Sequence, residues 1–188
     1  MNRFHRWYCC SRGWAHEVEG TLVPWVVDDV DLGDDVIEIG PGPGMTTDAL
    51  RRRVARLTSV EIDERLASRL AARLAGTNVT VVHGDATQLP FAAGTFSGAT
   101  AMTMLHHVPS AVLQDRLLAE VCRVLRPGAV FTGSDSRWSR RFQLYHLFDT
   151  MTLVDPERFA DRLLDAGFVG PQVDTARGRF RFRALRPG

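Results

Sequence analysis

The stretch "VIEIGPGPGMTT" (residues 36–47) constrains the fold more than any other part of the sequence. A short apolar run ends near the acid Glu38, and three glycines then alternate with two prolines before a helical pattern begins. This order predicts a buried strand that turns sharply into a helix. Glycine has no Cβ atom, so a ligand can approach the backbone of such a turn closely. Turns of this kind bind phosphates, dinucleotides and other adenine-bearing cofactors, and the glycines alone do not choose among them.

Strand and helix patterns alternate along most of the chain. Strands are expected at 34–39, 57–63, 78–86, 94–105 and 126–136, and helices at 46–55, 64–75 and 110–125. Such alternation predicts a parallel sheet with helices on both faces. Near the C-terminus, Asp155 and Pro156 are a typical helix cap and first residue, and Gly167 ends that helix. Two strands follow with no helix between them, which predicts an antiparallel edge.

The length of 188 residues fits one domain with a substantial core. We divide it into an N-terminal helical cap (1–33), a core (34–134) and a third part (135–188) that contains a substrate-side segment and the C-terminal helix and strands. The net charge is +1, which does not indicate a nucleic acid or an acidic membrane as partner.

Several kinds of chemistry are excluded or disfavoured by composition. All 23 basic residues are arginine, so there is no Schiff-base lysine and no phosphate-loop lysine. Cys9, Cys10 and Cys122 are too few for a disulfide framework, and the Cys and His spacing predicts no metal site. No apolar run approaches the roughly 18 residues of a membrane span, and the N-terminus lacks the apolar core of a signal peptide. We therefore expect a cytoplasmic protein.

Acidic residues near the strand ends discriminate among ligands for the turn. A nucleoside triphosphate site would need a lysine, and a dinucleotide site would need Gly-x-Gly-x-x-Gly, whereas Met45 follows Gly-x-Gly-x-Gly here. A carboxylate at Glu38 would also repel a pyrophosphate. S-adenosylmethionine carries an ammonium, a sulfonium, a ribose and an adenine but no phosphate. We assign Glu38 to its amino-acid end, directly or through water, Glu61 to the ribose hydroxyls and Asp85 to the adenine amine.

Five motifs then occur in order: "VIEIGPGPG", "VEID", "GDATQLPF", "TMLHHV" and "VLRPGAVF". In sequence and spacing they resemble the Rossmann-like (class I) S-adenosylmethionine-dependent methyltransferases, most closely the small-molecule subgroup that includes the ubiquinone/menaquinone C-methyltransferases. The resemblance covers residues 34–134. It implies an α/β, three-layer Rossmann-like methyltransferase fold with a mostly parallel seven-stranded sheet and an antiparallel last strand. It also implies cofactor contacts at Glu38, Gly40, Gly42, Gly44, Glu61, Ile62, Asp85, Ala86, Met102 and Thr103.

The acceptor side is less defined. Methyl transfer is an in-line displacement, and a general base is needed only if the acceptor must lose a proton. His106 and His107 follow the fourth strand and are the candidate catalytic residues, unless one of them packs or caps the next helix. The segment 136–151 is expected to form a wall of the substrate site, with Phe142, Tyr145 and His146 as acceptor contacts; the alternative is a plain amphipathic helix on the sheet.

The sequence thus predicts S-adenosylmethionine-dependent methyl transfer to a small, apolar or aromatic acceptor. Alternatives are a catalytically inactive S-adenosylmethionine-binding or partner protein and an NAD-dependent oxidoreductase. A nucleic-acid acceptor is disfavoured, because no Asn/Asp-Pro-Pro-aromatic signature follows the fourth strand. Assembly into a homo-oligomer is left open.

Overall fold

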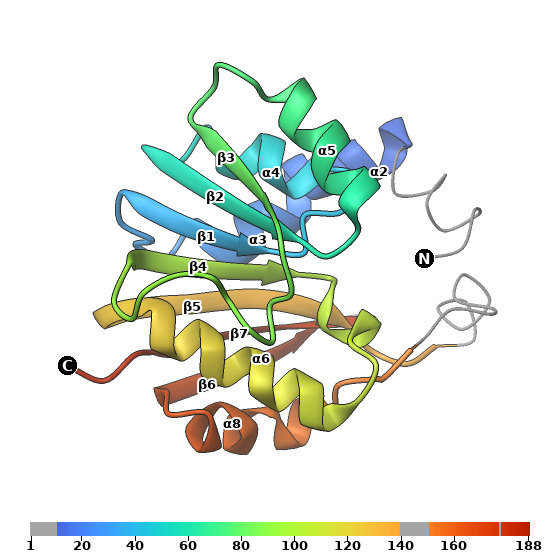
Figure 1. Ribbon diagram of the computed structural model, residues 1–188. Helices are drawn as coiled ribbons and strands as arrows, with labels where there is room; N and C mark the ends of the chain where they lie inside the picture. Colours follow the sequence, from blue (N-terminus) through green and yellow to red (C-terminus); the bar gives the residue numbers. More distant parts are fainter. Residues whose placement is uncertain (1–10, 140–150, 177) are drawn as a thin grey trace.

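The computed structural model describes residues 11–139, 151–176 and 178–188. A seven-stranded sheet in the order β3-β2-β1-β4-β5-β7-β6 lies between helices on both faces (Figure 1). The strands are β1 (Asp35–Ile39), β2 (Arg56–Glu61), β3 (Val79–His83), β4 (Phe96–Met102), β5 (Leu125–Ser136), β6 (Val169–Ala176) and β7 (Arg179–Leu185). The helices are α2 (Arg12–Glu17), the π-helical η1 (Val18–Leu22), α3 (Val23–Val27), α4 (Met45–Leu50), α5 (Glu64–Arg73), the 3-10 turn η2 (Leu105–His107), α6 (Ala111–Val124) and α8 (Pro156–Asp165).

Strand direction confirms the predicted fold class. The strands β1 to β5 pair in parallel where they are neighbours, and β7 pairs antiparallel with both β5 and β6. The expected antiparallel pairing lies at the β6 side of the sheet, where the last strand, β7, runs against both of its neighbours. The chain passes through α8 to the outermost strand β6 and then turns back, so that β7 fills the place between β6 and β5.

The strand order reverses beside β1, which pairs with β2 on one side and β4 on the other. In open parallel sheets a crevice forms at the carboxyl ends of the strands at such a switch point. The fold therefore places the carboxyl end of β1 at the position where this architecture binds ligands.

Alternating residues of the strands supply two separate cores. On one face Val36 packs with Leu22, Leu50 and other apolar residues of the N-terminal helices and α4. On the other face Ile37 belongs to the larger core, which includes residues of α6 and α8 such as Phe159. The alternation along β1 also places Glu38 on the same face as Val36, within the layer of the N-terminal helices and α4.

Arginines of β7 connect this strand to the N-terminal helices. They alternate with phenylalanines that are fully buried in the larger core. Arg179 pairs with Glu17 at 3.1 Å, and Arg181 pairs with Asp29 and lies over the ring of Trp25. The arginine face of β7 therefore contacts acidic side chains of the N-terminal segment.

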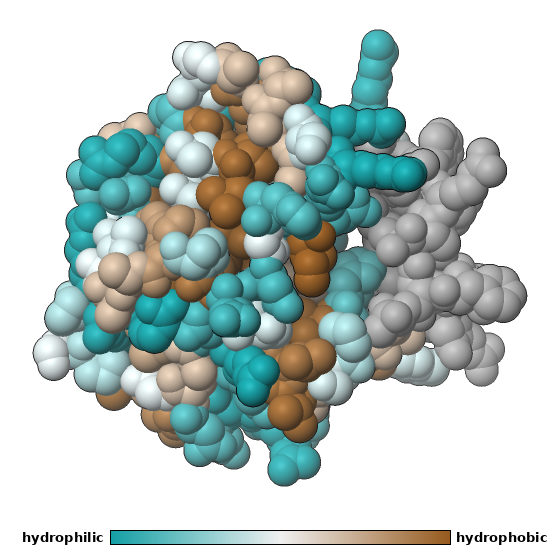
Figure 2. Space-filling view, in the orientation of Figure 1, coloured by the Kyte–Doolittle hydropathy of each residue, from teal (hydrophilic) through white to brown (hydrophobic). Residues whose placement is uncertain are grey.

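Side chains at the helix starts explain the helix boundaries. Asp63 caps α5, Ser110 caps α6 and Asp155 caps α8, each by accepting a hydrogen bond from a backbone N–H in the first turn. Within the described residues no helix is long and apolar enough to cross a membrane, and no cluster of His, Cys, Asp or Glu is arranged to hold a metal. Figure 2 shows that hydrophobic residues gather in the middle of one face, between the α5 side and the α6 side.

A glycine in β5 tests the packing of the sheet. A Cβ atom on Gly133 would lie 2.1 Å from the carbonyl oxygen of Ala101 and 2.7 Å from the Phe182 ring. We expect Gly133→Ala to lower the free energy of unfolding by about 1–3 kcal/mol or more, because the backbone of β4 cannot yield cheaply. Urea denaturation measures the change.

The matched control is Gly20→Ala, where an added Cβ would meet nothing within 4 Å. It should be neutral or stabilise by up to about 1 kcal/mol. Equal stability of the two variants would contradict the packing described for β5.

Candidate functional site

The glycine turn lies at the carboxyl end of β1, beside the switch in strand order. Gly40, Gly42 and Gly44 all have positive φ angles, of 67°, 56° and 91°. A Cβ atom on Gly40 would lie 3.0 Å from Met104, and one on Gly44 would lie 2.4 Å from Leu70. A Cβ on Gly42 would meet nothing within 4 Å. The turn is therefore packed against protein at its two ends and open at its middle glycine.

Glu38 lies beneath the turn, with only 2% of its surface exposed. Its carboxylate accepts hydrogen bonds from the hydroxyls of Thr46 at 2.5 Å, Thr47 at 2.7 Å and Ser59 at 2.7 Å. Burial raises the pKa of Glu38, while the hydroxyl donors act in the opposite direction. The structure thus gives Glu38 a supporting role that joins β1 to β2 and α4, and its contact with a cofactor remains a prediction.

Glu61 joins the end of β2 to the same turn. One carboxylate oxygen accepts from the backbone N–H of Gly42 and the other from that of Asp63, both at 2.9 Å. Glu61 is 6% exposed. A carboxylate oxygen can accept more than one hydrogen bond, so Glu61 keeps the capacity for further donors, and its contact with ribose hydroxyls remains a prediction. The next side chain, Ile62, is 67% exposed although it is apolar. The end of β2 therefore offers an acceptor and an apolar surface beside the open glycine.

The residues after β3 are less enclosed. Asp85 is exposed, and one of its oxygens accepts a hydrogen bond from the N–H of Thr87 at 2.8 Å. Ala86 is partly buried against the larger core. Asp85 thus lies just after β3, the neighbour of β2. Its contact with an adenine amine remains a prediction.

The end of β4 holds an unusual backbone conformation. The Met102 side chain is buried in the core beneath the N-terminal helices, so a cofactor contact at this residue would involve its backbone. Thr103 has φ of 53°, which is rare for a β-branched residue, and its N–H donates to the Ser134 carbonyl at 2.7 Å. Strained backbone of this kind is common at functional sites.

The predicted histidines lie in the turn η2 that follows. The His106 side chain is only 3% exposed; its Nδ1 lies 2.5 Å from the fully buried Asp135, and its backbone N–H donates to the other oxygen of that carboxylate at 3.0 Å. The ring of His107, a partly exposed residue, lies 4.2 Å from the His106 ring between centroids. Asp135 at the end of β5 therefore fixes the position of η2.

The three predicted acceptor contacts, Phe142, Tyr145 and His146, lie outside the described residues. Beyond residue 150, the N–H of Thr152 donates to the His106 carbonyl at 2.8 Å. Gln114 of α6 donates to the carbonyls of both Leu105 and Thr152. The segment that follows residue 150 is thus joined to the histidine turn.

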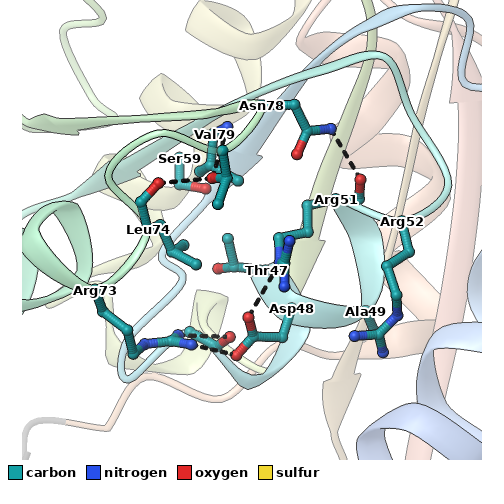
Figure 3. Close-up of polar contacts among 12 residues, drawn as sticks. Thr47, Asp48, Ala49, Arg51, Arg52, Ser59, Arg73, Leu74, Asn78 and Val79 are labelled. Carbon is teal, nitrogen blue, oxygen red and sulfur yellow. Dashed lines mark hydrogen bonds and ion pairs between the residues drawn. The ribbon is translucent and has the colours of Figure 1, made fainter.

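Sequence reasoning missed the side chains that support the turn. Thr46, Thr47 and Ser59 were not assigned to the site, and neither was Arg73, which contacts the turn from α5. Figure 3 shows Thr47, Ser59 and Arg73 in the region between α4 and α5. The sequence did hold a signal for the hydroxyl donors. Ser59 pairs with Glu38 in the register of β1 and β2, and Thr46 and Thr47 follow the glycine turn directly.

Comparisons with known proteins identify the family of this chain. The model of a methyltransferase-domain family matches residues 37–132, half of the chain. A probable ribosomal RNA small subunit methyltransferase A of Methanospirillum hungatei is 43% identical over 74 residues, which are 37% of this chain and 29% of that protein. The ribosomal RNA small subunit methyltransferase A of Bordetella pertussis is 34% identical over 141 residues, 67% of this chain and 52% of that protein. The chain thus spans about half or less of the length of these curated relatives.

Among solved structures, an S-adenosylmethionine-dependent methyltransferase from Aquifex aeolicus superimposes with a TM-score of 0.77 at 15% identity. The match covers 99% of each chain and supports the fold. This protein belongs to the methyltransferase-domain family. The solved structure from Aquifex aeolicus that shares its fold is described as S-adenosylmethionine-dependent. The predicted methyltransferase family and its cofactor are confirmed. The ubiquinone C-methyltransferase-like subgroup remains a prediction.

The buried carboxyl of Glu38 generates a pH prediction. Its folded-state pKa is raised above the ordinary value of 4.5, so the native state binds the proton more tightly than the unfolded chain does. The contribution of Glu38 to stability is therefore largest below pH 4.5 and decreases as pH rises through the folded pKa. Glu38→Gln removes this titration and keeps a group that the hydroxyls can contact.

We expect the free energy of unfolding of wild type, relative to Glu38→Gln, to fall as pH rises from 4.5 and to level off above the folded pKa. Urea denaturation at a series of pH values measures this difference. Parallel pH profiles for the two proteins would show that burial does not shift the pKa.

Proposed function

We propose that this protein transfers the methyl group of S-adenosylmethionine to a small, apolar or aromatic acceptor. The observation that supports the cofactor part of the proposal is the open side of Gly42, which lies between protein-packed glycines and next to the Glu61 carboxylate. An added Cβ would fill that space, so the turn is shaped for close approach of a ligand.

The donors and acceptors around this opening fit the cofactor. The Glu61 carboxylate would accept from ribose hydroxyls, and the exposed Ile62 side chain would pack against the adenosine. Asp85 would accept from the adenine amine. Glu38 would act on the amino-acid end only indirectly, through the turn or through water, because it is almost fully buried and already accepts three hydroxyl hydrogen bonds.

The bound cofactor would supply a methyl carbon that its sulfonium activates for displacement. The task of the protein is then to hold the acceptor nucleophile in line with that carbon. Thr103 and the turn η2 lie where the fourth strand ends, on the same side of the sheet as the glycine turn. We therefore place the acceptor beside η2 and the segment after β5.

Within η2 the two histidines would have different tasks. His106 is almost fully buried and hydrogen-bonded to Asp135, so we assign it to positioning the turn. His107 is partly exposed and would accept a proton from an acceptor that carries a hydroxyl or amine. An acceptor that enters already deprotonated, such as an enolate, would need no such base.

A nucleic-acid acceptor is the second candidate, because the relatives from Methanospirillum hungatei and Bordetella pertussis are named as ribosomal RNA methyltransferases. The residues after β4 do not favour it: "TMLHHV" stands where base-methylating enzymes carry an Asn/Asp-Pro-Pro-aromatic signature. A partner protein that binds S-adenosylmethionine without catalysis is the third candidate.

Calorimetry followed by an acceptor screen distinguishes the three candidate functions. We expect S-adenosylhomocysteine to bind and NAD not to bind. Radiolabelled methyl transfer should then occur to a small molecule and not to ribosomal RNA. Transfer to RNA alone would contradict the proposed acceptor class, binding without any transfer would indicate a partner protein, and failure to bind S-adenosylhomocysteine would refute the cofactor assignment.

Ile62 offers a substitution with little effect on folding. Because its side chain is mostly exposed, Ile62→Ala should barely change stability but should weaken S-adenosylhomocysteine binding by about 1–2 kcal/mol through lost apolar contact. Leu164→Ala on α8, another exposed apolar residue, is the control and should leave binding unchanged. Unchanged affinity in Ile62→Ala would place the adenosine elsewhere.

His107 tests the proton-transfer assignment. With a hydroxyl or amine acceptor, His107→Ala should lower kcat by about 100-fold, the usual contribution of a general base, while S-adenosylhomocysteine affinity stays the same. A variant that retains full kcat with such an acceptor would exclude His107 as the base.

A further inference from the structure

The last residue of α5, Arg73, reaches back over the glycine turn. Its Nη1 pairs with Asp48 of α4 at 2.5 Å, and its Nη2 donates to the carbonyls of Pro43 and Gly44, both at 3.3 Å. Figure 3 shows Arg73 and Asp48 pointing toward each other, and Asp48 also contacting Arg51. One guanidinium thus binds the turn and the helix that follows it.

The position of Gly44 shows how closely α5 lies on the turn. An added Cβ there would be 2.5 Å from the Arg73 guanidinium and 2.4 Å from Leu70. Gly44 is also the residue before α4, with a left-handed backbone that fixes the direction in which this helix leaves. Arg73 and Leu70 therefore occupy the packed side of the turn, away from the open side at Gly42.

The β2–α5 unit contacts the turn at two places, where β2 ends and where α5 ends. Glu61 at the end of β2 accepts from the N–H of Gly42, and Arg73 at the end of α5 donates to the carbonyls of Pro43 and Gly44. Residues of the β2–α5 unit therefore bind both an N–H donor and two carbonyl acceptors of the turn. The spacing between the turn and Ile62, across which the adenosine would lie, depends on these contacts.

Arginine suits this position better than lysine would. Its planar group offers five N–H donors in a fixed arrangement, which allows it to bind two carbonyls and a carboxylate at once, whereas an ammonium is a compact point charge. The Arg73 side chain is 42% exposed, and exposed ion pairs of this kind add little to global stability. Its main effect should therefore be on the local shape of the turn.

We propose that Arg73 is a positioning residue of the cofactor site: it holds the glycine turn in its binding-competent shape without contacting the cofactor. The proposal rests on the proposed function, because it assumes that the open side of the turn receives S-adenosylmethionine. Preorganisation of a binding loop increases affinity by reducing the ordering cost of binding.

The test compares Arg73→Met and Arg73→Lys with Arg69→Met, an exposed arginine about one turn earlier on α5. S-adenosylhomocysteine is titrated by calorimetry at a temperature at which circular dichroism shows every variant folded. We expect the Kd of Arg73→Met to rise about tenfold with little change in Tm. Arg73→Lys should recover part of the affinity through Asp48, and Arg69→Met should match wild type.

The outcomes separate this inference from the proposed function. If wild type binds S-adenosylhomocysteine and Arg73→Met binds it equally well, the positioning role is refuted while the function stands. A lowered Tm with unchanged Kd would likewise show that Arg73 is merely structural. If wild type does not bind the ligand at all, the proposed function fails, and this inference fails with it.

Discussion

A buried carboxylate that accepts three hydroxyl hydrogen bonds lies under the functional end of this sheet. Glu38 would be costly to bury alone, and Thr46, Thr47 and Ser59 offset that cost while joining two strands to the first turn of α4. The glycine turn begins two residues later and cannot move far from this network. The contacts that Glu61, Leu70 and Arg73 make with the turn are therefore set relative to this network.

Around the turn the protein separates a packed side from an open side. Leu70 and Arg73 fill the packed side, while Gly42 is open and its N–H is bound by Glu61, the residue before the exposed Ile62. The second half of the site, the turn η2, is fixed independently by Asp135 and Gln114. Cofactor and acceptor would thus be positioned by two rigid parts on neighbouring strands, which is what an in-line displacement requires.

Much of the fold could be predicted from sequence, because strand and helix periods alternate regularly from residue 34 onward and the helix caps are local signals. The order of the last two strands could not be predicted. The sequence of Arg179–Leu185 holds no local signal that places this strand between β5 and β6. Within the site, glycines and acids were recognisable by type and spacing. The hydroxyl donors to Glu38 and the Arg73 contact depend on tertiary register, so they became visible only in three dimensions.

The proposed function depends on the open side of Gly42 receiving the adenosine part of S-adenosylmethionine. A crystal structure of the wild-type protein with S-adenosylhomocysteine would show where the ligand binds. We expect ribose hydroxyls on Glu61, adenine beside Ile62 and the turn unchanged in backbone conformation. A ligand bound away from Gly42, or a turn that must refold to admit it, would rule out this site.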